Sequence, residues 1–455
     1  MYYYKRDARQ KQFLLYAGFV VFVLVVVFVY RSEYFERQEP NIILKDTVVW
    51  NLENPVSISI SDNFGIKSYR VSLVKEDSQI ILLEKRASGE KKIDINVSFP
   101  TRTFFPKGDV KLFVEVKDNS YWNFGAGNKK QASADVVLDR QKPVVSIISK
   151  SYTINLGGTA LVIYKVDDKN LDHTKIITNS DKEFESGIFR KEGYYISLIA
   201  RDLRTKDFKA YIYAVDKAGN ETHKLINMLN KNINYRSSNI GLSDLFLNGK
   251  ITQLYKENFK EEEPDLLARF SKINEDLRQN AESVVLKHTT NVLETKLNRF
   301  DINSFGPLKR YLKVGSFGDH RFFYKNKDLV GQSYHLGIDI ANNEHGDIYA
   351  SNNAKVVYTG NNGVYGKMIV LYHGLGLYSI YGHCSEFSVK NGQIVKKEQI
   401  IGKTGRTGLA LGDHLHFETR VQGVPVRPAE WLDENWINYN IKRPIEKAIK
   451  IMGDD

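Results

Sequence analysis

The sequence predicts a multidomain, mainly β protein that begins with one transmembrane (TM) helix. An unbroken run of uncharged, mostly apolar residues occupies 13–30. Stretches of alternating apolar and polar residues follow over 48–230, and a charged segment with helical spacing separates them from the glycine-punctuated strands of the last third. A chain of 455 residues is too long for one ordinary hydrophobic core, so several domains are expected.

The apolar run is about long enough to cross a bilayer as a helix. By the positive-inside bias, the basic residues before it keep segment 1–11 in the cytoplasm; they are Lys5, Arg6, Arg9 and Lys11. A cleaved signal peptide is the alternative, but no small-x-small cleavage site follows the run. We therefore predict an uncleaved, single-pass helix at 12–30 in the inner membrane. A linker would follow at 31–47, with the rest of the chain in the periplasm.

Segment 48–230 has the alternation of half-buried strands. The clearest examples are 56–60, 69–73, 112–116, 160–164 and 210–214. A loose internal repeat also appears, with a period of about one hundred residues: Ser61-Asp-Asn-Phe-Gly-Ile66 is echoed by Val166-Asp-Asp-Lys-Asn-Leu171. We predict two β-sandwich modules, 48–141 and 142–230, which resemble bacterial immunoglobulin-like (Ig-like) domains. Such modules act as spacers or as docking surfaces for protein partners.

A helical connector is predicted at 231–300. Apolar residues recur there at helical spacing within a charged stretch, namely Leu266, Phe270, Ile273, Leu277, Val284 and Val285. The stretch follows Glu261-Glu-Glu-Pro264, where proline suits a first helical turn. The helices could reach over a groove of the next domain or pair two chains, but packing on that domain is the default expectation. A short basic tail, 438–455, ends the chain.

Two short strings in the last third suggest a metal site, His335-x-Gly337-x-Asp339 and His414-x-His416. A catalytic zinc ion takes about three protein ligands and keeps one position open, and neutral imidazole and carboxylate suit it. On a strand, side chains repeat every second residue, so each string would present its polar side chains on one face. Gly337 disfavours the alternative helical spacing. Two short strands could therefore close one metal site.

Five motifs between about residues 306 and 432 carry a family resemblance. In order they are His335-x-Gly337-x-Asp339; Val364-Tyr-Gly-Lys-Met-Ile-Val370; Tyr381-Gly-His383; Gly402-Lys-Thr-Gly-Arg-Thr-Gly408; and His414-Leu-His-Phe-Glu418, followed by Pro428-Ala-Glu-Trp-Leu432. Together they resemble the lysostaphin-type (LytM) zinc metallopeptidases, which cut the peptide part of bacterial peptidoglycan. The resemblance covers only the C-terminal third and implies an antiparallel β zinc-peptidase domain at 301–437.

The resemblance implies that His335, Asp339 and His416 hold one zinc ion per chain. It makes His383 and His414 an unligated catalytic pair. Zinc acidifies water, so one neutral imidazole could take a proton as the nucleophile attacks a scissile carbonyl. The other imidazole, if protonated, would stabilise the oxyanion. The sequence leaves open which histidine takes which role.

Two neighbouring residues are interpreted as supporting ones. Glu418 could be imagined as a base, but a role in orienting a metal ligand is preferred. Cys384 stands beside His383, yet adjacent strand residues point to opposite faces, so we expect a buried, inert thiol. Because it is the only cysteine, an intrachain disulfide framework is excluded.

The sequence thus predicts a membrane-anchored zinc endopeptidase that hydrolyses peptide bonds of peptidoglycan stems or cross-links, in wall remodelling or cell shape. The main alternative is a non-catalytic LytM-type activator of other wall hydrolases, whose mark would be missing zinc or catalytic positions. An adhesion protein that uses its β modules is a third reading. The net charge of +11 could favour anionic membrane or wall polymers. Basic residues are interspersed with acids, so no nucleic-acid partner is expected.

Overall fold

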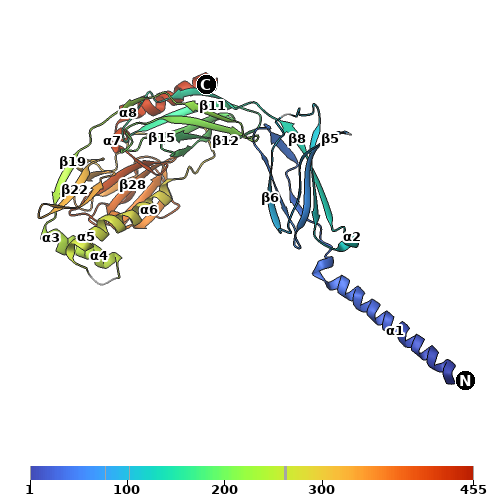
Figure 1. Cartoon of the computed structure of the whole chain (residues 1–455). Coiled ribbons are helices and arrows are strands. Elements are labelled where there is room, and N and C mark those ends of the chain that lie inside the picture. Colours follow the sequence, from blue (N-terminus) through green and yellow to red (C-terminus); the bar gives the residue numbers. More distant parts are fainter. Residues whose placement is uncertain (1, 77, 102, 261–263, 454–455) are drawn as a thin grey trace. The chain divides into compact units, whose positions relative to one another are not determined.

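The computed structural model describes residues 2–76, 78–101, 103–260 and 264–453, with the backbone alone for residues 2–8. Strands hold 42% of the residues and helices 22%, so the predicted mainly β class is confirmed. The chain divides into two compact units, Met1–Lys142 with Val215–Asn220 and Pro143–Ala214 with Glu221–Asp455. Figure 1 labels the elements of both units along the chain. The acidic run at 261–263 lies outside the described residues.

The first unit begins with helix α1 (Tyr2–Arg31). Its segment Arg9–Arg31 is long and apolar enough to cross a membrane, and none of it is buried by other parts of the chain. A signal sequence near an N-terminus has the same properties. The helix therefore agrees with the predicted span at 12–30, and its length and composition alone do not distinguish an anchor from a leader.

Two sheets follow α1 and enclose one core. One sheet has the strand order β1 (Asn41–Ile43), β3 (Val56–Ser61), β6 (Lys92–Val97), and the other has the order β2 (Thr47–Trp50), β8 (Lys129–Leu138), β7 (Val110–Asp118), β4 (Ile66–Lys75), β5 (Ser78–Arg86). Burial alternates along β7, as its period-two pattern predicts. The core packs Trp50, Ile60, Val71 and Leu112 at 1% exposure or less.

The second unit contains a second pair of sheets. Their strand orders are β20 (Lys296–Leu297), β14 (Gly187–Phe189), β15 (Tyr194–Ala200), β11 (Thr159–Asp167), β9 (Val144–Lys150), and β13 (Glu183–Glu185), β12 (Leu171–Thr178), β16 (Ala210–Asp216), β17 (Glu221–Leu225). Strand β20 comes from the far end of the helical connector and pairs in parallel with β14. The basic tail forms helix α9 (Arg443–Met452), which packs on β9 and β11. This module, which we call module 2, is thus tied to later parts of the chain.

An eight-stranded sheet forms the C-terminal domain. Its order is β21 (Leu312–Gly315), β24 (Ile338–Ala341), β32 (Leu415–Val421), β28 (Leu377–Cys384), β27 (Lys367–Tyr372), β26 (Ala354–Asn361), β30 (Ile394–Val395), and β33 (Val424–Val426) pairs with β32. A smaller sheet has the order β25 (Asp347–Tyr349), β31 (Ile400–Lys403), β29 (Glu386–Phe387), and another has β19 (Ser237–Gly241), β22 (His320–Lys325), β23 (Asp328–Tyr334).

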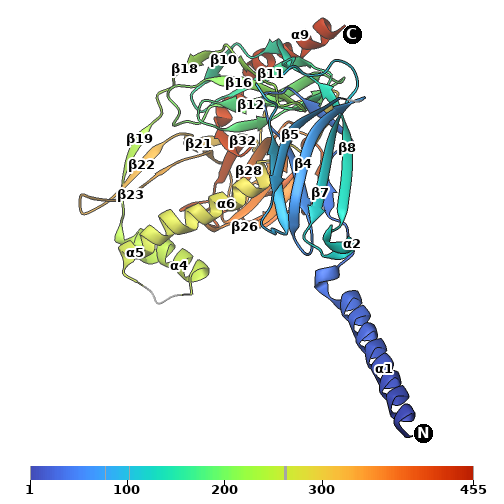
Figure 2. The ribbon, with the colours of Figure 1, turned by 45° about the vertical axis from the view of Figure 1, so that its right-hand side comes forward.

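Both faces of the eight-stranded sheet are covered. The connector helices lie against one face beside β26 and β28 (Figure 2), where residues such as Leu277, Ala281 and Val285 pack on Met368 and Ile380. These helices are α4 (Thr252–Asn258), α5 (Leu266–Lys272) and α6 (Arg278–Thr289), with a π-helical turn at Ile273–Leu277 that joins α5 to α6. The other face shares one apolar core with module 2. The packing expected of the connector is therefore what the structure shows.

Candidate functional site

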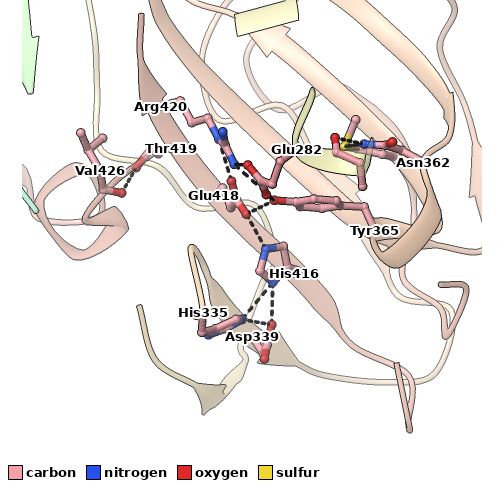
Figure 3. A network of polar contacts seen from close by, with 12 residues as sticks. Glu282, His335, Asp339, Asn362, Tyr365, His416, Glu418, Thr419, Arg420 and Val426 are labelled. Atoms are coloured by element: carbon pink, nitrogen blue, oxygen red, sulfur yellow. Dashed lines mark hydrogen bonds and ion pairs between the residues drawn. The ribbon is translucent and has the colours of Figure 1, made fainter. Parts of the chain in front are cut away.

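Asp339 and His416 lie opposite each other on two paired strands. Asp339 belongs to β24 and His416 to β32, and the two residues are register partners in the antiparallel ladder, which places their side chains on one face. His335 reaches the same point from the segment just before β24 (Figure 3). Its Nε2 lies 3.0 Å from Asp339 Oδ1 and 3.1 Å from His416 Nδ1, and the last two atoms are 2.9 Å apart.

The prediction that both strings run as strands is wrong for His335, which follows the end of β23 and precedes β24. His414 forms an antiparallel β-bridge with Gly405 directly before the first residue of β32. The chain bends between His335 and Asp339 because Gly337 passes close over the neighbouring strand. A Cβ at Gly337 would lie 2.6 Å from the carbonyl oxygen of Phe417. Gly337 therefore lets the backbone of this string pass close to the neighbouring strand, where a side chain would not fit.

The other ring nitrogens of the two histidines are held by the protein. His335 Nδ1 lies 2.8 Å from the carbonyl oxygen of Ser316, to which it donates, and His416 Nε2 donates to Glu418 Oε1 over 2.9 Å. The nitrogens that face Asp339 are then free to offer lone pairs. Two imidazole nitrogens and one carboxylate oxygen form a donor set that suits zinc and leaves room for a further ligand. The three residues could therefore hold a metal ion.

The charges at this point favour a bound cation. Burial disfavours an ionised Asp339, but the two adjacent imidazoles outweigh it and hold the pKa of its carboxyl well below the usual range. Burial also disfavours a charged His416, but the carboxylates of Asp339 and Glu418 raise its pKa to about 9. The site thus attracts positive charge, and a metal ion bound there would displace a proton.

His383 and His414 lie beside this point with their Nε2 atoms uncommitted to the backbone. His383 Nδ1 donates to the carbonyl of Thr407 over 2.8 Å, and His414 Nδ1 donates to that of Gly412 over 2.9 Å. Their ring centroids are 4.8 Å apart, and His414 Nε2 lies 3.7 Å from Asp339 Oδ1. Burial, and then the neighbouring imidazoles, lower the pKa of His383 well below its usual value, so this ring is neutral.

The backbone of His383 is strained. Its φ of 62° lies in the left-handed region, which costs a residue with a side chain of order 1 kcal/mol or more. The residue is the last but one of β28, before Cys384, and is itself 7% exposed. A strained, buried histidine that faces two other imidazoles is the kind of outlier that clusters at functional sites.

A buried chain of polar contacts extends from His416 to helix α6 (Figure 3). Glu418 Oε2 accepts from Arg420 Nε over 2.9 Å, and Arg420 Nη2 donates to Glu282 Oε2 over 2.8 Å. The hydroxyl of Tyr365 lies 2.6 Å from Oε1 of both glutamates. Burial opposes ionisation of Glu418, but the guanidinium of Arg420 outweighs it and holds the pKa of Glu418 at about 2. The predicted orienting position of Glu418 is thus part of a longer network.

Sequence reasoning did not single out Arg420, Tyr365 or Glu282. Arg420 could have been predicted, because residues 416, 418 and 420 of β32 point to the same face of the sheet. Tyr365 stands in a recognised motif without a visible partner. Glu282 carries no signal in the sequence, because only the packing of α6 on the sheet brings it to Arg420.

A cleft of about 1070 Å³ opens at the site. The five predicted site residues all line it. Residues from outside the C-terminal sheet complete the wall; they are Lys182, Asp202, Leu203 and Arg204 of module 2, and Arg278, Glu282 and Leu286 of α6. Module 2 and the connector therefore both shape the space in which a substrate would bind.

Cys384 does not face this cleft. Its side chain is fully buried, and its Sγ contacts the carbonyl oxygen of Tyr381 at 3.5 Å. Burial raises the pKa of the thiol to about 12, so the reactive thiolate is not populated near neutral pH. A cysteine-nucleophile mechanism has no support in this geometry.

Comparison with known proteins concerns the C-terminal third. The model of peptidase family M23 matches residues 333–428. Over 94 residues the chain is 37% identical to DD-carboxypeptidase/endopeptidase Mpg of Neisseria meningitidis. The matched region covers 21% of this chain and 22% of that protein. Over 92 residues it is 40% identical to peptidoglycan DD-endopeptidase ShyA of Vibrio cholerae, and this region covers 20% of this chain and 21% of that protein. The chain thus spans about a fifth of the length of these curated relatives.

A solved structure with the same likeness is the catalytic domain of lysostaphin from Staphylococcus simulans. It is 30% identical and covers 28% of this chain and 92% of that one, with a TM-score of 0.23. The predicted resemblance to lysostaphin-type enzymes is confirmed by these matches. Residues 333–428 therefore form a C-terminal domain of peptidase family M23, the LytM type.

Proposed function

We propose that this chain is a zinc-dependent endopeptidase that hydrolyses peptide bonds in peptidoglycan. The observation that supports this most directly is the convergence of His335 Nε2, Asp339 Oδ1 and His416 Nδ1 within 3.1 Å of one another, at a cleft that two further imidazoles line. Among the positions that the structure describes, no member of the predicted set of five is missing. A regulator that has lost its chemistry would have no need of the complete set.

Zinc held by His335, Asp339 and His416 would act as a Lewis acid for the scissile carbonyl and would acidify water. His383 is neutral, and its Nδ1–H is committed to a backbone carbonyl, so its Nε2 can accept a proton from the attacking water. The proton taken up by His383 would then pass to the leaving amine, and His414 in its protonated form would stabilise the oxyanion through its Nε2–H. His383 as base and His414 as electrostatic partner are therefore the assignment that we prefer.

We further propose that α1 remains as an uncleaved anchor in the inner membrane and that the catalytic domain faces the periplasm. The basic residues before the apolar segment and the bulky, charged sequence after it support an anchor over a cleaved leader. The first β-sandwich and module 2 would then set how far the site reaches into the wall. Such an enzyme would act in wall remodelling or in determining cell shape.

The function can be tested on the full-length chain in detergent. Purified peptidoglycan is incubated with the zinc-loaded chain, the chelated chain and the chain with zinc restored, and the released muropeptides are analysed by mass. We expect new products that chelation and His416→Ala abolish. His223→Ala, at an exposed histidine of β17, serves as the matched control and should leave the products unchanged. An unchanged muropeptide profile under every metal condition would favour the non-catalytic activator.

A further inference from the structure

Arg278, the first residue of α6, lines the cleft without a carboxylate partner within the described part of the chain. Its Nε donates to the carbonyl of Asn274 over 3.2 Å, and its Nη2 lies 3.3 Å from Asn274 Oδ1. Glu282, one helical turn away, is at the usual spacing for an ion pair. However, the two oxygens of Glu282 accept hydrogen bonds from Tyr365 and Arg420. Arg278 therefore forms no ion pair with Glu282, and its guanidinium can pair with a carboxylate of a bound ligand.

A second guanidinium, that of Arg321 in β22, lines the same cleft. Its Nε lies 3.3 Å from Asp319 Oδ2, and its Nη2 lies 3.6 Å from Asp339 Oδ2. Asp339 is a proposed metal ligand, so its charge would be shared with the ion. Burial lowers the pKa of Arg278, the nearby Tyr365 and Glu282 oppose this shift, and the like charge of Arg321 adds to it. Two cationic groups, both half-buried, thus line the same cleft.

The remaining carboxylates that line the cleft do not neutralise these two groups. Each is already engaged: Asp202 pairs with Arg204 at 2.8 Å, Glu418 pairs with Arg420 at 2.9 Å, and Asp413 accepts from the hydroxyl of Thr404 at 2.5 Å. Removing even part of the hydration of a guanidinium is unfavourable unless a counter-charge replaces it, and Arg278 has no carboxylate in an ion pair among the described residues. An anion bound between the two guanidinium groups would supply it.

We infer that Arg278 and Arg321 form a subsite for a free carboxylate of the peptide substrate. This inference rests on the proposed function. A guanidinium presents paired N–H donors that match the two oxygens of a carboxylate, which gives direction as well as attraction. Both arginines lie outside residues 333–428, so the subsite is carried by the connector and by β22 and not by the family domain. The enzyme would then select peptides that carry a carboxylate near the scissile bond.

The test compares matched synthetic cross-linked peptides with the full-length, zinc-loaded chain in detergent. One peptide keeps all its carboxylates, a second has only its C-terminal carboxylate converted to the amide, and a third has only its side-chain carboxylate converted. We expect kcat/KM to fall about tenfold for one of the two amidated peptides, mainly through KM, because the subsite then loses its charge partner. The peptide that loses activity identifies which carboxylate is bound.

Variants locate the effect. Arg278→Gln should lower kcat/KM about tenfold for the peptides that keep the recognised carboxylate and should have no further effect on the amidated peptide that lacks it, and Arg278→Lys should restore part of the difference. Arg299→Gln, at an exposed arginine paired with Asp301 at 2.9 Å, is the control and should change neither. Because Arg278 has no acidic partner to lose, Arg278→Gln should melt at the same temperature as the parent chain or higher. A lower melting temperature would contradict the unpaired charge.

Different results would overturn the peptidase function and the carboxylate subsite. If the parent chain cleaves none of the peptides, the proposed peptidase function is wrong. If it cleaves all three equally well, or if Arg278→Gln and Arg278→Lys both keep the full preference for the carboxylate, the peptidase function stands and the subsite is wrong.

Discussion

Glu282 Oε2 lies 2.8 Å from Nη2 of Arg420, and this contact joins helix α6 to the strand that carries His416. Arg420 is 1% exposed and is held between two carboxylates, those of Glu282 and Glu418. Tyr365 has one hydroxyl proton and two glutamate oxygens at 2.6 Å, so Glu282 competes with Glu418 for the same donors. The helical connector therefore helps to support the proposed metal site.

Replacement of Glu282 should weaken metal binding. In Glu282→Gln, one of the two carboxylates that pair with Arg420 becomes neutral. Glu418 then turns toward Arg420, and His416 loses part of the hydrogen bond that orients its ring. We expect the zinc dissociation constant to rise about tenfold, as for other groups that orient ligands through hydrogen bonds. Competition with a chromophoric chelator measures this without enzyme activity. Glu275→Gln, at an exposed position before α6, is the control, and an equal constant in both variants would refute the coupling.

Replacement of the two unligated imidazoles should separate chemistry from metal binding. His383→Gln is expected to lower kcat by about a hundredfold or more, which is the usual contribution of a general base. His414→Gln should lower kcat through lost stabilisation of the oxyanion. Both variants should still bind one zinc ion per chain, as measured by elemental analysis. Loss of the metal in either variant would show that its histidine is a ligand.

A methyl group at Gly337 should disturb the site by contact alone. The added Cβ would lie 2.6 Å from the carbonyl oxygen of Phe417 and 2.9 Å from Cε1 of His416. Gly337→Ala should therefore cost about 1–3 kcal/mol of stability, as overpacking does, and should weaken zinc binding. Gly412→Ala, where the Cβ would meet open space, is the control. Thermal melting of both variants measures the loss of stability, and zinc titration of both measures the weakening of zinc binding.

Glu430 should make the stability of the second unit depend on pH. Its side chain is 2% exposed and accepts from Asn155 Nδ2 at 2.6 Å and from the backbone N–H of Thr159 at 2.9 Å. Burial raises its pKa from 4.5 to about 7, so the folded state binds the proton more tightly than the unfolded state. Stability from this group is complete below about pH 4.5 and is lost as the pH rises to about 7, by roughly 3 kcal/mol.

Glu430→Gln removes the titrating group and should flatten this slope, although one hydrogen-bond acceptor is replaced by a donor. Chemical unfolding of the full-length chain between pH 4.5 and 8 measures it, with Glu446→Gln on α9 as an exposed control. A slope that persists unchanged in Glu430→Gln would mean that another group causes it.

The sequence by itself determined the local features of this protein. The alternation of apolar and polar residues predicted strands such as β3 and β7, because alternation follows directly from strand geometry. The strand predicted at 160–164 lies in β11, but this strand is buried on both faces and not half-buried as predicted, because both of its faces are covered. The residues of the proposed metal site could be predicted because they stand in short, ordered motifs. The strand state of His335 was predicted wrongly, since the close approach of Gly337 to Phe417 depends on the neighbouring strand.

Only the tertiary structure decided which distant residues serve the site. Glu282 and Arg278 lie on a helix whose sequence shows an apolar face and ordinary surface charges. They reach Arg420 and the cleft because that apolar face packs on the eight-stranded sheet. Module 2 lines the same cleft through Lys182 and Arg204, although its sequence shows only alternating strands. Periodicity reports what each segment buries, whereas the partners of a polar side chain depend on how the segments pack together.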